Sequence, residues 1–185
     1  MISNKNLVWI DLEMTGLNPD RDVILEIATI ITDSALTHIE DGPTYVIHQP
    51  QAILDHMDEW NRVQHTKSGL LQETQTSNIS LAQAYQETLS CIQNFCTPKT
   101  ALLCGNTVYQ DRAFLLRYMP DIVNYLHYRI IDVSTIKELV RRWYPQDSCA
   151  FFEKQEAHRA LPDIRQSITE LQHYRKHFFV PFKND

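Results

Sequence analysis

The sequence predicts an α/β fold in which helices pack on a mixed β-sheet. Three short apolar runs lie within the first 48 residues, and beyond them short apolar runs alternate with helical patterns. Neighbouring strands followed by alternating strands and helices are typical of a mixed sheet flanked by helices. A chain of 185 residues without repeat, low-complexity tract or linker fits one domain, which we expect over residues 1–185.

The first strand is predicted at residues 7–13, where Leu-Val-Trp-Ile-Asp-Leu-Glu is mostly apolar, β-branched or aromatic. Residues 16–22 contain Asn-Pro-Asp and predict a turn. Two further strands are predicted at 23–33 and 44–48. Because the three strands follow one another closely, we expect an antiparallel meander.

Later elements alternate between helix and strand. A Ser-Leu-Ala-Gln capping box at Ser80 begins one helix, and Ser134 is expected to cap another. Pro162 is expected in the first turn of the last helix. The remaining predicted elements are strands at 101–104 and 130–133 and a helix at 113–118, which Pro120 interrupts.

Net charge bears on the class of partner. The formal charge is −6 and the pI is about 5.7, whereas a protein that grips a long nucleic acid usually presents a basic face. The composition therefore disfavours a long nucleic acid as the partner, although it is compatible with a local basic pocket. A short oligonucleotide is easier to reconcile with this charge.

Compartment and cysteine chemistry follow from simple patterns. No apolar run approaches the length of a membrane span and the first residues lack the pattern of a signal peptide, so we expect a cytoplasmic protein without membrane contact. The four cysteines form no Cys-x-x-Cys pair, which predicts reduced thiols and argues against a zinc site.

The first candidate site residues are Asp11 and Glu13, which flank Leu12 near the end of the first predicted strand. Side chains alternate along a strand, so both carboxylates are expected on one face. Two adjacent carboxylates repel each other and are costly to desolvate unless a cation lies between them. A strand end that reaches solvent explains the pair equally well.

Asp111 follows the predicted strand that ends before Gly105-Asn106, on the next helix or just before it. Ligand sites of α/β sheets form where strands lead into helices. An acid here is also typical of an ordinary helix N-terminus, where the dipole favours it. Asp111 alone therefore leaves both interpretations open.

His158 and Asp163 are five residues apart, about 500° of helical rotation, so they would not share one helix face. The Pro162 position places Asp163 on the last helix and His158 in the loop before it. A loop histidine can move toward a carboxylate held on a rigid element, although most such histidines are simply solvated.

Together, four acids and a histidine on separate elements suit a site for two divalent cations. Hard ions such as Mg²⁺ or Mn²⁺ prefer carboxylate oxygen and water as ligands. Two such ions can hold a phosphodiester for attack by water. A histidine can accept the proton of that water because imidazole titrates near neutral pH.

Three motifs carry a resemblance to a known superfamily. They are Asp11-Leu-Glu13-Met-Thr-Gly-Leu, Gly105-Asn106-Thr-Val-Tyr-Gln-Asp111-Arg and His158-Arg-Ala-Leu-Pro-Asp163-Ile. These resemble the exonuclease motifs of the DEDDh superfamily. Met57-Asp-Glu-Trp60-Asn and His65-Thr-Lys-Ser-Gly69-Leu are similar to the oligoribonuclease family in particular, and the resemblance extends over residues 7–179.

The resemblance implies a ribonuclease H-like fold with a five-stranded mixed sheet, and a single 3′-to-5′ exonuclease domain that acts on very short RNA. It implies that four carboxylates bind two Mg²⁺ or Mn²⁺ ions and that His158 is the general base. It also leaves open a related exonuclease for longer DNA or RNA ends, or a binding module without catalysis. The implied metal ligands are Asp11, Glu13, Asp111 and Asp163.

The resemblance also implies a site for the bases of the substrate. Trp60 lies among polar residues, where a stacking surface for a base and a tryptophan half-buried at a helix end are both reasonable. The resemblance favours stacking, with Leu17 on the other side of the base and His65 near the substrate.

A cap for the 5′ phosphate is implied by Thr107, Tyr128, Arg129 and Ser134. Arginine binds phosphate through two hydrogen bonds, but a solvated arginine beside a helix-capping serine fits the sequence equally well. The resemblance places Tyr128 and Arg129 in the site of a partner subunit, which implies a homodimer. Thr107 stands where serine is usual in the family, and Pro162 where an acid is common.

Overall fold

The computed structural model describes residues 3–154 and 158–180 and contains a five-stranded mixed sheet with the strand order β3-β2-β1-β4-β5. Strand β2 pairs antiparallel with β1 and with β3, whereas β4 pairs parallel with β1 and with β5. The expected mixed sheet and its antiparallel meander are therefore confirmed. The strands are β1 (Leu7–Met14), β2 (Ile24–Thr32), β3 (Ile39–Val46), β4 (Leu102–Gly105) and β5 (Ile130–Asp132).

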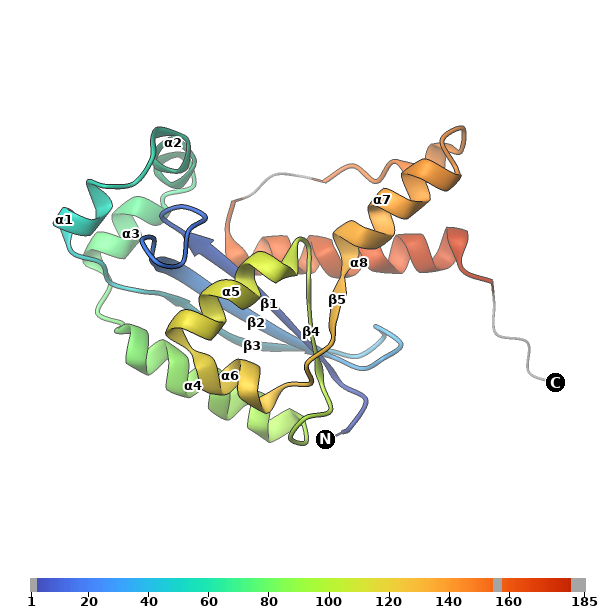
Figure 1. Cartoon of the computed structure of the whole chain (residues 1–185), viewed down its shortest axis with the longest axis horizontal. Coiled ribbons are helices and arrows are strands. Elements are labelled where there is room, and N and C mark those ends of the chain that lie inside the picture. Colours follow the sequence, from blue (N-terminus) through green and yellow to red (C-terminus); the bar gives the residue numbers. More distant parts are fainter. Residues whose placement is uncertain (1–2, 155–157, 181–185) are drawn as a thin grey trace.

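Helices cover both faces and one end of this sheet (Figure 1). Helices α4, α5 and α6 lie on one side, α7 and α8 on the other, and the short helices α1 to α3 gather beyond one end of β1 and β2. The helices are α1 (Gln51–Leu54), α2 (Glu59–Lys67), α3 (Leu70–Thr76), α4 (Leu81–Phe95), α5 (Val108–Tyr118), α6 (Pro120–Tyr125), α7 (Val133–Trp143) and α8 (Ala160–Phe178). A 3₁₀ turn, η1, covers Ser148–Ala150.

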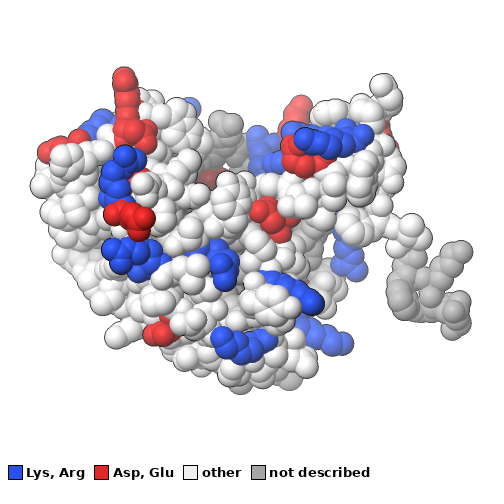
Figure 2. All heavy atoms as spheres, in the orientation of Figure 1, with Lys and Arg blue, Asp and Glu red and all other residues white. Residues whose placement is uncertain are grey.

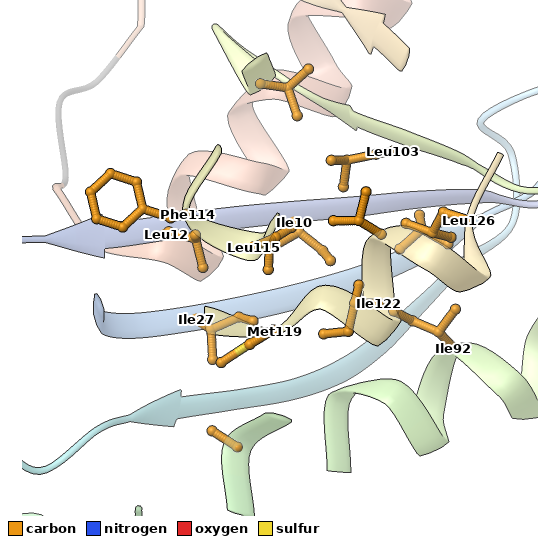
Figure 3. Packing of buried hydrophobic residues seen from close by; sticks show 14 of the residues in the cluster. Ile10, Leu12, Ile27, Ile92, Leu103, Phe114, Leu115, Met119, Ile122 and Leu126 are labelled. Carbon is orange, nitrogen blue, oxygen red and sulfur yellow. The ribbon is translucent and has the colours of Figure 1, made fainter. Parts of the chain in front are cut away.

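The alternation of side chains along β1 divides the core into two layers. Val8, Ile10 and Leu12 are buried against α4, α5 and α6 (Figure 3). Leu7 and Trp9 are buried on the opposite face, against α7 and α8. Because Asp11 and Glu13 continue the series of Leu7 and Trp9, both carboxylates belong to the α8 face, as the alternation predicts.

Several predicted boundaries were wrong. Helix α5 begins at Val108, five residues before the predicted start at 113, so Asp111 lies within it. Strand β3 begins at Ile39, five residues before the predicted start, because an edge strand tolerates polar residues and Pro43 on its unpaired side. Ser134 does not cap α7. The cap is Asp132, whose carboxylate accepts the Ser134 amide at 2.9 Å, because β5 ends one residue earlier than predicted.

The other differences concern short or polar helices. Helices α1 to α3 were not predicted, since they bury few apolar side chains, among them Leu54 and Leu70. Ser80 caps α4 as predicted, since its hydroxyl accepts the backbone N–H of Gln83, and the side-chain amide of Gln83 donates to Glu87.

Phe114 lies fully buried between α5 and the sheet (Figure 3), so we expect Phe114→Ala to lower the free energy of unfolding by about 3–5 kcal/mol. The matched control is Leu116→Ala on the same helix, where the side chain is 44% exposed and the expected loss is below about 0.5 kcal/mol. Urea unfolding measures both, and equal losses would contradict this account of the core.

Candidate active site

Strand β1 carries the first two carboxylates to the edge of the α8 face. In the β1–β2 register Asp11 lies opposite Ala28 and Glu13 lies opposite Glu26. The small side chain of Ala28 leaves room beside Asp11. The two acids therefore sit next to each other at the end of a buried strand, as the sequence predicts.

Asp163 joins them from the first turn of α8. Asp11, Glu13 and Asp163 each place a carboxylate oxygen within 4.8 Å of the other two. Asp163 lies 150 residues after Glu13 in the sequence, and the packing of α8 on β1 and β2 brings the two carboxylates together.

Asp111 lies in the first turn of α5 and is only 6% exposed. Its Oδ1 accepts the backbone N–H of Leu12 at 3.0 Å, which fixes the carboxylate beside the peptide between Asp11 and Glu13. Its negative charge raises the pKa of Asp11, second only to the effect of burial. All four predicted acids therefore belong to one electrostatic cluster.

Burial and mutual repulsion disfavour ionisation of these acids. Burial, followed by the charges of Asp111 and Glu13, raises the pKa of Asp11 well above its usual range. Burial and the Asp163 charge raise the pKa of Glu13 to about 8. Burial also raises the pKa of Asp111 to about 7, against the opposing hydrogen bond from Leu12. Such a cluster stays ionised at neutral pH only with added positive charge.

The donor set fits a hard divalent cation. Three carboxylate oxygens converge within one coordination sphere and a fourth acid borders them, without sulfur or imidazole in the described group. Mg²⁺ and Mn²⁺ prefer oxygen ligands of this kind. The raised pKa values of Asp11 and Glu13 also indicate a cation site. Burial and the charges of the neighbouring acids raise these pKa values, and the positive charge of a bound cation would lower them.

His158 and Trp60 contact each other through their rings. Their ring centroids are 5.8 Å apart and the rings are perpendicular. Trp60, on α2, is 61% exposed, and Leu17, in the loop after β1, is 70% exposed. The side chain of Gln110, next to Asp111, donates to the Leu17 carbonyl and ties this loop to α5. Leu17 thus follows the strand that carries Asp11 and Glu13, and Trp60 contacts the histidine that precedes the helix of Asp163.

His65 lies behind Glu13 and is 1% exposed. Its Nε2 lies 2.9 Å from the carbonyl oxygen of Met14, and its Nδ1 lies 3.9 Å from Glu13 Oε2. Burial lowers the pKa of His65, which favours the neutral ring. In the structure His65 contacts a carboxylate of the group and is closed off from solvent.

Thr107 and Ser134 form a second small group. The Thr107 N–H donates to Ser134 Oγ and to Asp132 Oδ1, both at 3.0 Å, and the two hydroxyls lie 3.1 Å apart. Thr107 has a φ of 54°, a left-handed conformation that is costly for a β-branched residue and is often found at functional sites. His158, with a φ of 48°, is another such residue.

Tyr128 and Arg129 lie elsewhere on the same chain. Tyr128 is 72% exposed and lines a hollow with Lys99, Arg112 and His127, whereas Thr107 and Ser134 line a different hollow. The Arg129 guanidinium lies 5.4 Å from the centre of the Tyr128 ring. Lys and Arg side chains spread over the lower half of the face shown in Figure 2, despite the net charge of −6.

Sequence reasoning missed a buried polar network behind the site. Glu170 is 1% exposed and accepts from Lys154 Nζ at 2.9 Å and from Asn106 Nδ2 at 3.1 Å. Asn106 also accepts the Ser134 hydroxyl at 3.1 Å, and the Lys154 charge lowers the pKa of Asp11. Asn106 stands within a motif and could have been singled out, whereas nothing local in the sequence distinguishes Lys154 or Glu170.

Comparisons with known proteins agree with this arrangement. The family model described as Exonuclease (RNase_T) matches residues 8–171. The oligoribonuclease of Pseudomonas aeruginosa PAO1 is 53% identical over 178 residues, which cover 96% of this chain and 98% of that protein. The oligoribonuclease of Marinobacter nauticus is 51% identical over 179 residues, which cover 97% and 99%.

Solved structures share the fold at low sequence identity. Exonuclease I of Methylocaldum szegediense has a TM-score of 0.67 and 20% identity, covering 94% of this chain but 41% of that longer chain. Pop2p of S. pombe, solved with Mg²⁺ and Mn²⁺ bound, has a TM-score of 0.68 and 14% identity, covering 94% and 84%. These matches confirm the predicted ribonuclease H-like fold.

Fold, acidic site and family match define the class as a 3′-to-5′ exoribonuclease of the DEDDh superfamily. Within that class, about half of all residues are identical to those of oligoribonucleases over nearly the whole length, and this identity decides the family. The chain belongs to the oligoribonuclease family, and the resemblance drawn from its motifs is confirmed. Among the helices of the described residues, none is both long and apolar enough to cross a membrane.

The raised pKa values predict how the stability of the metal-free protein depends on pH. Glu13 holds its proton up to about pH 8 when folded and only to about 4.5 when unfolded. Between these values the folded state binds more protons, so stability falls as pH rises. Thermal unfolding in EDTA should show a lower Tm at pH 8 than at pH 5.5.

Addition of Mg²⁺ or Mn²⁺ should reverse this loss. At about 100 times Kd a bound ion adds about 2.7 kcal/mol, or about 5–10 °C in Tm for a chain of this size. The increase should be larger at pH 8 than at pH 5.5 and should disappear in Asp11→Asn. An equal increase in that variant would show that the ions bind elsewhere.

Proposed function

We propose that this chain hydrolyses very short RNA oligonucleotides, dinucleotides above all, from the 3′ end to 5′-mononucleotides. The observation that carries the proposal is the convergence of Asp11, Glu13 and Asp163 within 4.8 Å, together with the ring contact between Trp60 and His158, which lies just before the helix that carries Asp163. The match over residues 8–171 supports a single exonuclease domain over the chain.

The chemical step uses the carboxylates and His158 together. Asp11, Glu13, Asp111 and Asp163 would hold two divalent ions, Mg²⁺ or Mn²⁺, which supply Lewis-acid activation of water and stabilise charge on the phosphodiester. His158 precedes Asp163 by five residues, in the loop that leads into α8, and takes the proton from the attacking water. Its place in the loop before α8 lets the imidazole reach the site without belonging to the metal ligands.

Trp60 and Leu17 bind the bases. Both side chains are exposed to solvent, as a stacking surface for a base requires. Stacking of a base on an aromatic ring contributes about 1–3 kcal/mol and does not depend strongly on base identity. We place His65 near the same end of the substrate, where it supports Glu13.

The 5′ phosphate is capped by residues of two subunits. The Thr107 and Ser134 hydroxyls, 3.1 Å apart, offer hydrogen bonds to one phosphate. Tyr128 and Arg129 line a separate part of the surface of their own chain, so they are available to complete the cap of a second copy. A cap at this position favours substrates little longer than a dinucleotide and requires a homodimer.

An exonuclease for longer DNA or RNA ends is the alternative, and the basic side chains on one face favour it (Figure 2). The overall charge of −6 and the exposed Arg129 and Trp60 favour the short substrate. A protein that binds nucleotides without cleaving them is disfavoured because all four acids and His158 are present.

Removal of one acid should abolish turnover without unfolding the chain. We expect Asp163→Asn to lower kcat on a 5′-phosphorylated RNA dinucleotide at least about a thousandfold, while relieved repulsion keeps the Tm in EDTA at or above that of the parent. Product chromatography and thermal unfolding measure the two effects. Turnover that persists in this variant, or in EDTA, would contradict metal-dependent catalysis by these residues.

Substrate length separates the two exonuclease proposals. The rate per 3′ end should be at least about tenfold higher on a dinucleotide than on a 20-residue RNA, and Arg129→Ala should remove most of that preference by weakening the phosphate contact. Arg117→Ala is the matched control on α5. A faster rate on the 20-residue RNA, or a monomer in sedimentation, would favour the alternative.

A further inference from the structure

Arg159, between His158 and the first residue of α8, makes contacts that the catalytic scheme does not use. Its Nε lies 3.1 and 3.2 Å from the two carboxylate oxygens of Glu26, and its Nη2 lies 2.9 Å from one of them. Its Nη1 and Nη2 donate to the carboxylate of Glu73 at 3.0 and 2.8 Å. One guanidinium thus joins two carboxylates from different elements.

Glu26 connects this guanidinium to the catalytic strand. It is 2% exposed on β2 and lies opposite Glu13 in the β1–β2 register. Glu26 Oε2 also accepts the N–H of Ala160 at 2.9 Å. A buried carboxylate with several charge-assisted hydrogen bonds is a rigid anchor, so the start of α8 is held against the strand that carries Glu13.

Glu73 connects the same guanidinium to the base-binding helices. It lies on α3, directly after α2, which carries Trp60. Arg159 Nη1 also lies 3.5 Å from the carbonyl oxygen of Ser68, at the junction of α2 and α3. The helix pair that presents Trp60 is therefore tied to the segment that presents His158.

His158 needs such support because of its backbone. Its φ of 48° is left-handed, a conformation that is unfavourable for a residue other than glycine unless its surroundings hold it there. The neighbouring Arg159 backbone is extended, with a φ of −141°, and its side chain is fixed at both ends. The perpendicular contact of His158 with Trp60 lies between the two tied segments.

We infer that Arg159, clamped by Glu26 and Glu73, is a positioning residue that holds His158 at its working distance from the carboxylates and from Trp60. The inference rests on the proposed role of His158 as general base. Arg159 itself touches no substrate atom in this scheme. It acts through His158, because a small displacement of a catalytic group is enough to lower the rate strongly.

A lysine cannot reproduce the fork that contacts two carboxylates, so Arg159→Lys should keep the charge and lose the geometry. We expect kcat on the RNA dinucleotide to fall at least about tenfold, with the midpoint of the Mg²⁺ titration unchanged within about twofold. Glu73→Gln, at a partly exposed carboxylate, should lower kcat in the same direction by about threefold and leave folding intact.

The matched control is Arg165→Lys. Arg165 lies on α8, the helix that follows Arg159, and pairs with Asp41 on β3, where both side chains are about half exposed. This substitution also replaces an ion-paired arginine by lysine, but Arg165 pairs with a carboxylate on β3 and not with the segments that hold His158. We expect kcat to stay within about twofold of the parent.

A double-mutant cycle with His158→Ala separates positioning from general distortion. If Arg159 acts through His158, Arg159→Lys and Glu73→Gln should change kcat less than about twofold in the His158→Ala background. If Arg159→Lys lowers kcat by the same factor with and without His158→Ala, the inference is overturned. Equal kcat values for Arg159→Lys and Arg165→Lys would also overturn it. If His158→Ala alone lowers kcat less than about tenfold, the proposed general base fails instead.

Discussion

The structure is organised around the repulsion between carboxylates at the end of β1. Asp11 and Glu13 share a face of the central strand, and Asp163 and Asp111 approach them from two helices. Burial raises the pKa values of Asp11, Glu13 and Asp111, and the charges of the neighbouring site acids raise those of Asp11 and Glu13 further, so the folded chain holds these groups close together at a cost to its own stability. A cation that binds them removes this cost, which is why the same groups favour metal binding.

Several features hold the acids together against this repulsion. The Leu12 N–H donates to Asp111 and fixes its carboxylate. The buried side chains of Ile10 and Phe114 belong to one core cluster that keeps α5 against β1 (Figure 3). On the opposite face, Glu170 holds Lys154, whose charge lowers the pKa of Asp11. The positive charge of Lys154 therefore partly offsets the repulsion among the acids.

Several groups outside the carboxylate cluster are held in defined positions. Trp60 and Leu17 are exposed apolar side chains, the Thr107 and Ser134 hydroxyls lie 3.1 Å apart, and Arg159 links the Trp60 segment to the segment of His158. Left-handed backbone at Thr107 and His158 is held in place by neighbouring hydrogen bonds or ion pairs. In the proposed function these groups bind the bases and the 5′ phosphate and so limit the length of the substrate.

The sequence by itself determined the fold class, the pairing of Asp11 with Glu13 and the division between a loop His158 and a helical Asp163, because each depends on alternation, helical period or the position of Pro162. It also carried the family through its motifs. Only the tertiary structure decided that Asp132 and not Ser134 caps α7, that β3 begins at Ile39, and that Lys154, Glu170 and Glu26 surround the site. The Asp132 cap depends on where β5 stops pairing with β4, and the other features depend on contacts between segments far apart in the chain. Local patterns contain no information about which distant partner satisfies a buried charge.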